Sequence, residues 1–395
     1  MRIEHVAVIG ANFGDEGKGM MTDYFAATSE YKTVVRFNGG SQAGHTVETP
    51  DGKRHVFSQI GAGTFAGLPT HISRFMLVNP IFMMREVAAL ESVGITPRVS
   101  MDPDVCLIIP HDVIGNRSDE SGRGKSRHGS VGHGVRKAIE RSMHRNRRLT
   151  VQDMVDASKS EICKVMMFVL GKDEKDMTLE ELMAVEAFCA ATKDMMDLIH
   201  VRRDHFVMKD PCIFEGAQGL LLDQNSGFFP HVTPSNTGLT NVMRLLGEAF
   251  PAMTDKDSHC LTPVYVTRSY LTRHGAGPMY RAGFVPSEPL VADDHGIPKD
   301  ETNVYNEWQE GLRIDRLSVA QLDHAVSGDF HLASMSHWVS LREPKLALTW
   351  ANVSPPTVEG ESAYRALREP KNFVDKPFDL AYASSGKTRE SVKPQ

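Results

Sequence analysis

The stretch IEHVAVIGANFGDEGKGMMTDYF, residues 3–25, decides the fold of this chain. It begins with a short, mostly apolar run that stops at Gly10, which is typical of a buried parallel strand. A glycine-rich loop, residues 14–19, leads from there into residues 20–25, which have helical character. Glycines between a strand end and a helix start let backbone N–H groups approach an anion, aided by the helix dipole. The stretch therefore predicts a strand–loop–helix unit that cradles phosphate.

The same alternation continues along the chain and predicts the fold class. A second strand, residues 33–37, leads into another glycine-rich turn from Asn38 to His45. Further strand patterns follow in short segments at residues 105–109, 212–214, 263–267, 330–333 and 345–348. Such alternation with helices is typical of a parallel sheet covered by helices. We expect an α/β fold with a large, mostly parallel central sheet flanked by helices, in a single domain over residues 1–395 with a mainly helical subregion at about 135–205.

Composition and charge restrict the function classes. The formal net charge is −6 at pH 7, whereas a duplex-binding protein usually carries a concentrated positive surface, so we expect no direct nucleic-acid binding. The five cysteines are scattered without CxxC spacing, which is typical of reduced thiols and not of a zinc site. No apolar run approaches the ~20 residues needed to cross a bilayer. The chain opens without a basic-then-apolar leader, so we expect a cytoplasmic location and no membrane partner.

Two segments are expected to lack regular structure. Residues 116–128 are rich in Ser, Gly, Arg and Lys, which predicts a mobile loop. The last few residues of the chain are expected to be disordered.

The first loop carries side chains that suit phosphate chemistry. It is not a Walker A loop, because position 12 is Asn and Lys18 is followed by Gly19 instead of Ser or Thr. Asp15 can bind magnesium or accept a proton, and Lys18 can neutralise phosphate. A glycine-rich loop can also be a purely structural turn, but these two charges favour the functional interpretation. His45, at the end of the second loop, suits proton transfer at the edge of a parallel sheet, and a merely satisfied polar histidine is the alternative.

The two loops together carry a family resemblance. GDEGKG at residues 14–19, followed by GG-x-x-AGHT at residues 39–46, resembles the adenylosuccinate synthetase family, and this pairing is highly specific. Three further segments are similar to the family's FEGAQGxLLD, PYVTSSNT and TRVGAGP motifs, at residues 214–223, 230–237 and 272–278, and residues 129–134 are a weaker echo of GTTGRG. The resemblance covers about residues 3–390 and implies the P-loop-NTPase-like fold of that family.

The resemblance implies a two-step ligation that uses Mg²⁺. A carboxylate removes the N1 proton of a 6-oxopurine nucleotide, O6 attacks the γ-phosphate of a nucleoside triphosphate, and the amino group of L-aspartate then displaces the 6-phosphoryl group. Asp15 matches the general base and a magnesium ligand, with the Gly44 carbonyl as a second ligand. One carboxylate in both roles couples deprotonation to the position of the metal. His45 matches the acid that stabilises charge on O6, and Lys18 and Gln218 complete the expected catalytic set.

The family pattern also assigns three groups of binding residues. The triphosphate and its base are expected at Gly14, Glu16, Gly17, Gly19, Met20, Thr46, Ser334, Ser336, Ser384, Ser385 and Gly386. The purine monophosphate is expected at Asn38, Gln42, Ser130, Val131, Arg145 and Thr233, and L-aspartate at Thr302, Asn303 and Arg313. Arg145 falls where the family sends an arginine into the site of its dimer partner, so we expect a homodimer. A solvated basic face over residues 136–148 is the alternative.

Three departures from the family pattern bear on the substrates. The arginine-rich TTGRRRR loop is replaced by ETNVYNEWQ at residues 301–309, and the loss of partners for ribose hydroxyls fits a deoxyribose. The Lys-Leu-Asp of the usual GTP site is matched to Ser334-Met335-Ser336, and without that Asp two donors of guanine would be unpaired, which favours ATP or dATP. Gln42 and Val131 replace an Asn and a Thr near the purine, which indicates a reshaped base pocket.

These departures resemble the bacteriophage branch of the family, which joins aspartate to dGMP and forms N6-succino-2-amino-dAMP for 2-aminoadenine DNA. Some members of that branch replace the catalytic Asp with a smaller residue, whereas this chain keeps Asp15. Three hypotheses follow: a dGMP:aspartate ligase, which we prefer, working in the host cytoplasm if phage-encoded; an adenylosuccinate synthetase using IMP and GTP; and a non-catalytic nucleotide sensor. The joint presence of Asp15, Lys18, His45 and Gln218 argues against the sensor, because a binding protein does not need them.

Overall fold

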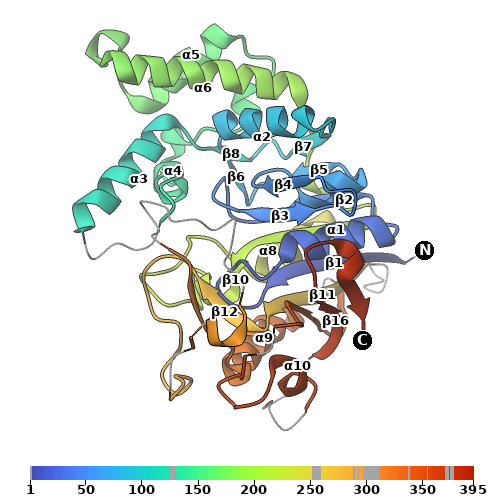
Figure 1. Cartoon of the computed structure of the whole chain (residues 1–395). Helices are drawn as coiled ribbons and strands as arrows, with labels where there is room; N and C mark the ends of the chain where they lie inside the picture. The colour runs from blue at the N-terminus through green and yellow to red at the C-terminus, as the bar shows by residue number, and fades with distance from the viewer. Residues whose placement is uncertain are drawn as a thin grey trace.

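The computed structural model describes residues 2–124, 130–250, 259–287, 290–291, 293–297, 311–336, 339–353, 355–369, 373 and 378–395. Within these residues, eleven strands form a central sheet. Its order is β17 (Val392–Pro394), β16 (Asp379–Ser384), β15 (Lys345–Thr349), β11 (His259–Arg268), β1 (Ile3–Gly10), β10 (Cys212–Gly219), β2 (Thr33–Arg36), β5 (Thr70–Ile72), β7 (Val99–Met101) and β9 (His200–Val201), with β14 (Ser340–Leu341) paired to β11. Of these pairings, that of β16 with β17 is antiparallel and the others are parallel. The predicted α/β class with a large, mostly parallel sheet is confirmed (Figure 1).

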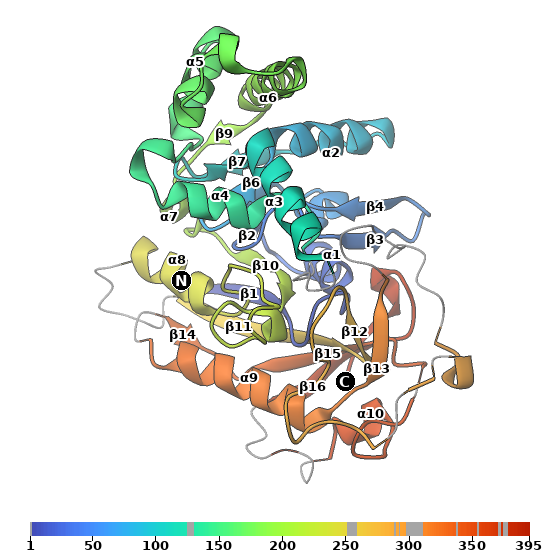
Figure 2. The same ribbon diagram turned by 90° about the vertical axis from the view of Figure 1, so that its left-hand side faces the viewer.

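Helices cover both faces of this sheet (Figures 1 and 2). The helices in the described residues are α1 (Lys18–Thr28), α2 (Pro80–Ser92), α3 (Pro110–Arg123), α4 (Val135–Ser142), α5 (Lys159–Leu170), α6 (Leu179–Leu198), α7 (Asp204–Val207), α8 (Thr240–Ala249), α9 (Val319–Ser334) and α10 (Ala363–Ala366). Three small strand pairs of the described residues lie outside the sheet: β3 (His45–Glu48) with β4 (Arg54–Phe57), β6 (Leu77–Val78) with β8 (Cys106–Leu107), and β12 (Tyr270–Arg273) with β13 (Arg313–Arg316). In the part of the chain that the structure describes, no helix is both long and apolar enough to span a membrane.

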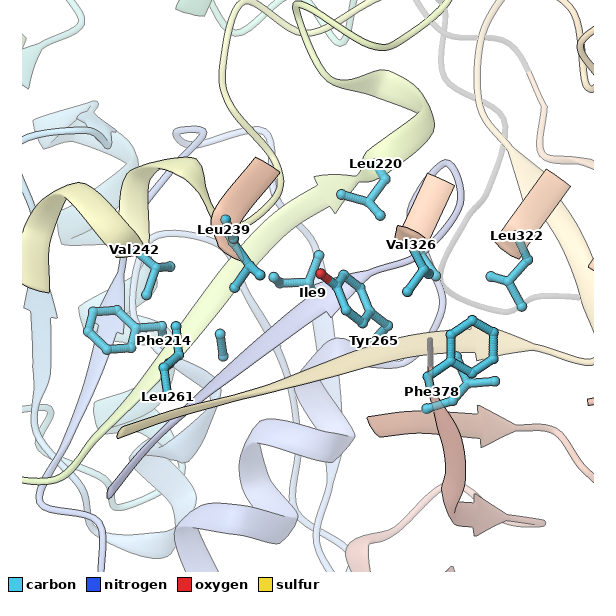
Figure 3. Packing of buried hydrophobic residues seen from close by; sticks show 14 of the residues in the cluster. Ile9, Phe214, Leu220, Leu239, Val242, Leu261, Tyr265, Leu322, Val326 and Phe378 are labelled. Atoms are coloured by element: carbon cyan, nitrogen blue, oxygen red, sulfur yellow. The ribbon is translucent and has the colours of Figure 1, made fainter. Parts of the chain in front are cut away.

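Strand β1 lies inside the sheet and explains why both faces need a helical cover. Ala7 and Ile9 belong to the apolar cluster that includes α8 and α9, whereas Val6 and Val8 pack with residues of α1 on the other face. Successive side chains of a strand point to opposite faces, so a strand that is apolar throughout requires apolar partners on both sides. Figure 3 shows the first face, where side chains of α8 and α9 meet those of β1, β10 and β11.

Helix α6 packs on both α5 and α2, and α5 and α6 lie at the end of the molecule away from β16 (Figures 1 and 2). Each begins with a capping box, formed by Ser158 with Glu161 and by Thr178 with Glu181. In a capping box the two side chains satisfy each other's backbone N–H groups, which fixes where the helix starts. Their buried apolar residues join one cluster with α2, β5 and β7, so these helices extend the core beyond the edge of the sheet.

Residues 330–333 do not form a strand, and that prediction is wrong. They belong to the end of α9, which starts where the hydroxyl of Ser318 accepts a backbone hydrogen bond from the first turn. Val319, Leu322 and Val326 form a buried stripe at helical spacing along this helix. A four-residue apolar segment fits either a strand or the last turn of such a stripe, because it is too short to show a period.

The expected mobile loop at residues 116–128 is also corrected where the structure describes it. Residues 116–123 are the second half of α3, and residues 125–129 lie outside the described part. Asn116 and Glu120 are buried one turn apart on this helix, and the side-chain oxygen of Asn116 accepts hydrogen bonds from the Ser130 hydroxyl and the Gly134 N–H. Asn116 and Glu120 face the protein, whereas Arg117, Ser118 and Ser121 are exposed, so the polar composition is that of a half-buried helix and not of a loop.

The end of the chain is ordered as well, contrary to expectation. Residues 392–394 form β17, which pairs antiparallel with β16 and closes that edge of the sheet. Backbone pairing of this kind does not require an apolar sequence, so composition alone did not indicate it.

Candidate active site at the carboxyl edge of the sheet

The loop between β1 and α1 is organised around the carboxylate of Glu16. Oε1 accepts hydrogen bonds from the backbone N–H groups of Asn12 and Gly14, at 3.1 and 2.7 Å, and Oε2 lies 2.7 Å from Nζ of Lys18. The side chains of Glu16 and Lys18 are only 2% and 3% exposed. A buried ion pair is stable when further hydrogen bonds satisfy its remaining polar atoms, and the two backbone donors do this here. The shape of the loop is therefore set before any ligand binds.

Two glycines are required in this loop. A Cβ atom at Gly10 would lie 2.5 Å from Oε2 of Glu16, so any side chain there would displace the ion pair. Gly17 has a φ of 99°, a backbone conformation that favours glycine, and it precedes α1 without any side-chain cap. The N–H groups of the first helical turn are left without helical partners, and such groups bind anions. Residues 18–20, which were predicted to hold phosphate, form this turn.

Asp15 also has a left-handed backbone, with φ of 61°. Its Oδ2 atom lies 3.2 Å from Nε2 of His274, the residue that follows β12. Burial alone would raise the pKa of Asp15, but the hydrogen bond and charge of His274, followed by the charges of Arg268 and Lys18, lower that pKa to about 2. Asp15 is therefore ionised at neutral pH and can accept a proton or bind a cation. The sequence analysis did not identify His274. Its one indication in the sequence is that it occupies the x of the TR-x-GAGP segment at residues 272–278.

His45 begins β3 and packs against the first turn of α1, where a Cβ atom on Gly19 would lie 3.0 Å from Cβ of His45. Its Nδ1 atom lies 2.7 Å from Oε1 of Glu215 on β10. The other carboxylate oxygen of Glu215 accepts a hydrogen bond from the N–H of Ala62, at 3.0 Å, and lies 3.6 Å from the guanidinium of Arg36. Sequence motifs did not reveal that His45, Glu215 and Arg36 form one buried charged group.

The protonation of this group follows from its surroundings. Burial lowers the pKa of His45, and the opposing charge and hydrogen bond of Glu215 do not restore it. Burial alone would raise the pKa of Glu215, but the charges of Arg36 and His45 lower it below its usual value. At neutral pH the charged Glu215 therefore accepts a hydrogen bond from the Nδ1–H of a neutral His45, and Nε2 is left for a ligand.

The second glycine-rich loop brings Gln42 and Gln218 together. The position of a Cβ atom on Gly39 would be 3.3 Å from Oε1 of Gln218 and 3.7 Å from Nε2 of Gln42. Both amide oxygens are buried and have no hydrogen-bond partner among the described residues. Because buried polar atoms normally have partners, these two amides suit a polar ligand. Asn38, expected to bind the monophosphate, instead engages its side chain in two hydrogen bonds with the backbone of Ala217.

Residues 130–136 contact this second loop from another part of the chain. Nδ1 of His133 lies 2.9 Å from the carbonyl oxygen of Ser41, and Arg136 donates to the carbonyl of Val232, next to the predicted Thr233. The predicted Ser130 is turned toward α3, where its hydroxyl meets Asn116. Arg145 is exposed in a short 3₁₀ helix at Arg145–Arg147.

The first loop is also bordered by the end of β15. The hydroxyl of Thr349 donates to the carbonyl of Glu16, at 2.7 Å, and a turn at residues 350–353 follows. This turn is bonded to Ser384 at the end of β16, whose hydroxyl lies 3.6 Å from the sulfur of Met20. The predicted residues Ser384 and Met20 therefore meet, and the turn 350–353 beside them is a functional candidate that the motif comparison missed.

Ser334 and Ser336 lie on the side of the sheet where the parallel strands begin, opposite the strand ends that carry the first loop. Ser334 ends α9, and the chain then enters β14, which pairs with the first residues of β11. The first loop instead adjoins the last residues of β11, where the N–H of Ala11 donates to the carbonyl of Val266. The assignment of Ser334 and Ser336 to the base of the triphosphate is therefore wrong. The order of the strands decides which strand end meets the loop, and a motif match does not contain that order.

Arg313, expected to bind the carboxylates of aspartate, holds the loop that follows β12. Its guanidinium donates to the carbonyl oxygens of Gly277 and Gly275, at 2.9 and 2.5 Å. Thr302 and Asn303, the other residues of that expected set, lie outside the described residues.

The donors expected for magnesium are oxygen atoms, from the carboxylate of Asp15 and the carbonyl of Gly44. Mg²⁺ is usually held by one or two protein groups together with waters and substrate phosphates. Among the described residues, no three His, Cys, Asp or Glu side chains gather into a metal site made of protein alone. The two oxygen donors fit an ion that binds together with a phosphate ligand.

Comparison with known proteins agrees with this geometry. Residues 7–285 match the family model of adenylosuccinate synthetase. Relatives of that name include proteins of Bordetella avium, 30% identical over 294 residues, and Pseudomonas aeruginosa, 33% identical over 291 residues. Each match covers 70% of this chain but only 64% of the relative.

Two solved structures share the fold. The fully ligated adenylosuccinate synthetase of Plasmodium falciparum has a TM-score of 0.69 and 16% identity, over 99% of both chains. The succinoaminodeoxyadenylate synthetase of cyanophage S-2L, bound to dGMP and dATP, has a TM-score of 0.64 and 15% identity, over 100% of this chain and 96% of that one.

We predict that His45 is neutral at pH 7 in the ligand-free protein, with its proton on Nδ1. Its pKa lies below the ordinary 6.5, so less than half of the rings should be protonated even at pH 6.5. Nitrogen NMR of histidine-labelled protein checks this, with the His45 signal identified by its loss in His45→Gln. Glu215→Gln should change the tautomer balance of that signal, and a doubly protonated ring at pH 7 would contradict the assignment.

Proposed function

This chain belongs to the adenylosuccinate synthetase family, and we propose that it is a carbon–nitrogen ligase that joins L-aspartate to C6 of dGMP. The product is N6-succino-2-amino-dAMP, and ATP or dATP is converted to the diphosphate and phosphate. The reaction runs through a 6-phosphoryl intermediate.

The first step is phosphoryl transfer to O6. The ionised carboxylate of Asp15 takes the proton from N1, and the electron pair moves onto O6, which attacks the γ-phosphorus while the diphosphate leaves. Lys18 and the N–H groups at the start of α1 stabilise charge on the phosphates. Mg²⁺, held by Asp15 and the Gly44 carbonyl, would supply further neutralisation of phosphate charge.

The second step replaces that phosphate with aspartate. The amino group attacks C6, the C6–O6 bond breaks, and phosphate leaves with O6. The nitrogen gives up one proton, which the departing phosphate accepts. His45, held through Nδ1 by Glu215, directs Nε2 to the oxygen at C6. A proton taken up at Nε2 when the nucleotides bind lets that nitrogen donate to the oxygen and stabilise its charge. The amide N–H groups of Gln42 and Gln218 can donate to the monophosphate group.

The convergence of four side chains on one loop carries this proposal. Asp15 and Lys18 belong to the loop, His45 packs against the start of α1, and the Cα of Gln218 lies 3.7 Å from a Cβ position on Gly14. A structural turn or a nucleotide sensor needs neither an ionised carboxylate nor a histidine oriented by a buried glutamate. A catalyst needs both.

Two observations support dGMP together with ATP or dATP. The turn at residues 350–353 beside the first loop carries the amide of Asn352 and no carboxylate. An amide can donate and accept toward adenine, whereas guanine presents neighbouring donors that a carboxylate matches better. The solved cyanophage enzyme of the same fold binds dGMP and dATP.

IMP is the second candidate substrate, and the retained Asp15 favours it. A full carboxylate leaves less room beside N1 for a 2-amino group than a smaller residue does. The same carboxylate can nevertheless accept a hydrogen bond from that amino group, so Asp15 is compatible with dGMP.

We predict phosphate release from purified protein with aspartate, magnesium chloride, dGMP and either ATP or dATP. The assay should cross dGMP and IMP with ATP, dATP and GTP, and mass spectrometry should identify the succino-nucleotide. Asp15→Ala and His45→Ala should each lower turnover by at least ~10²-fold, as expected for lost acid–base groups. Release with IMP and GTP but not with dGMP would reject the dGMP assignment, and no release with any pair would favour the sensor.

We further propose a homodimer in which the exposed Arg145 completes the partner's site. Arg145→Ala and Asp15→Ala proteins should each be inactive alone. Random exchange of subunits makes about half of the dimers hybrids, and each hybrid has one intact site out of two. An equal mixture should therefore recover about one quarter of wild-type turnover. Failure of the mixture to recover activity, while sedimentation shows that hybrid dimers form, would exclude this role.

A further inference from the structure

The contact between His274 and Asp15 joins two parts of the chain that are far apart in sequence. Nε2 of His274 lies 3.2 Å from Oδ2 of Asp15, and the two side chains are 19% and 20% exposed. The contact is therefore partly shielded from water. It involves one of the two carboxylate oxygens of the proposed general base.

The backbone on both sides of this contact is fixed. The hydroxyl of Thr272 donates to the carbonyl of Gly14, at 3.0 Å, which ties the end of β12 to the first loop. The guanidinium of Arg273 is buried and lies 4.4 Å from the ring centre of Phe13, in the same loop. Thr272 and Arg273, which precede His274, thus contact the two residues that precede Asp15.

The chain after His274 is held as well. Arg313, on the neighbouring strand β13, donates to the carbonyl oxygens of Gly275 and Gly277. Strands β12 and β13 lie side by side (Figure 2). They form an antiparallel pair in which Arg273 lies opposite Arg313. A side chain on a segment fastened at both ends keeps its direction, so the imidazole is a built part of the site and not a flexible surface group.

We propose, on the basis of the proposed function, that His274 is a positioning residue that orients the carboxylate of Asp15 toward N1 of the purine. The N–H at Nε2 donates to Oδ2, which restricts rotation of the carboxylate and directs its other oxygen to the substrate. The N1 proton passes to that other oxygen, and His274 keeps its own proton.

If His274 orients Asp15, its substitution should lower turnover without changing the affinity for the purine monophosphate. The nucleotide is held mainly through its phosphates, so loss of the hydrogen bond should leave KM for the purine monophosphate nearly unchanged. Proton removal from N1 should become slower, because a base that is out of line is less effective by about tenfold or more. A loss of folding or of binding would instead change KM or the thermal unfolding temperature.

The experiment compares His274→Val with His274→Gln, whose amide nitrogen can replace the Nε2 donor, in the phosphate-release assay with the purine monophosphate that the wild type uses. His274→Val should lower kcat by about tenfold or more with KM within about threefold, and His274→Gln should stay within about threefold of wild type. His200→Val, an exposed histidine on the edge strand β9, is the matched control and should be unchanged.

The same substitution in an Asp15→Asn background separates positioning from a general structural effect. Groups that act as one unit are not additive, so His274→Val should add less than about twofold to the loss caused by Asp15→Asn. An equal tenfold loss in both backgrounds, or equal losses in the Val and Gln variants, would overturn the positioning role. Wild-type protein without turnover on any purine monophosphate would overturn the proposed function and this role with it, whereas an active wild type and an equally active His274→Val would overturn the role alone.

Discussion

The buried ion pair between Glu16 and Lys18 is the interaction on which the site depends. The effective cost of removing an ion from water is several kcal/mol, so such a pair persists only where its other polar atoms are satisfied. Here the carboxylate of Glu16 also accepts two backbone hydrogen bonds from its own loop. Deleting either partner would leave an unpaired buried charge, at a typical cost of ~3–5 kcal/mol. The pair thereby fixes the path of the chain from β1 into α1 and keeps the start of α1 directed toward the ligand.

The rest of the site is assembled on this fixed loop. Thr349 bonds to the carbonyl of Glu16, Thr272 bonds to the carbonyl of Gly14, and His45 packs against the start of α1. Three strand ends are thus attached independently to one short segment, which lies at the carboxyl edge of the parallel strands (Figure 1). A site with groups that are held in place before the substrate binds needs little rearrangement during the reaction, and this is the main source of electrostatic stabilisation in enzymes. Glu215 holds the proposed acid, His45, in the same way, and His274 contacts the proposed base, Asp15.

How much of this could be read from the sequence depends on the distance between the partners. The strand–loop–helix unit at residues 3–25 was predictable because its apolar run, glycines and helix start are neighbours in the chain. The Ser334–Ser336 assignment failed because only the strand order shows that β15, and not the end of α9, meets the first loop. The contact of His274 with Asp15 was missed for the same reason. The second half of α3, residues 116–123, was mistaken for a loop because the partners that satisfy Asn116 come from beyond residue 129.

The proposed reaction depends on phosphoryl transfer to the oxygen at C6, and isotope labelling follows that oxygen. Purified protein would be given dGMP with ¹⁸O at position 6, together with ATP, aspartate and magnesium chloride. We expect each released phosphate to contain one ¹⁸O atom, because O6 leaves C6 as part of the phosphate. Without aspartate, labelled phosphate should not accumulate. Released phosphate without the label, with ¹⁸O retained in the nucleotide, would contradict the account.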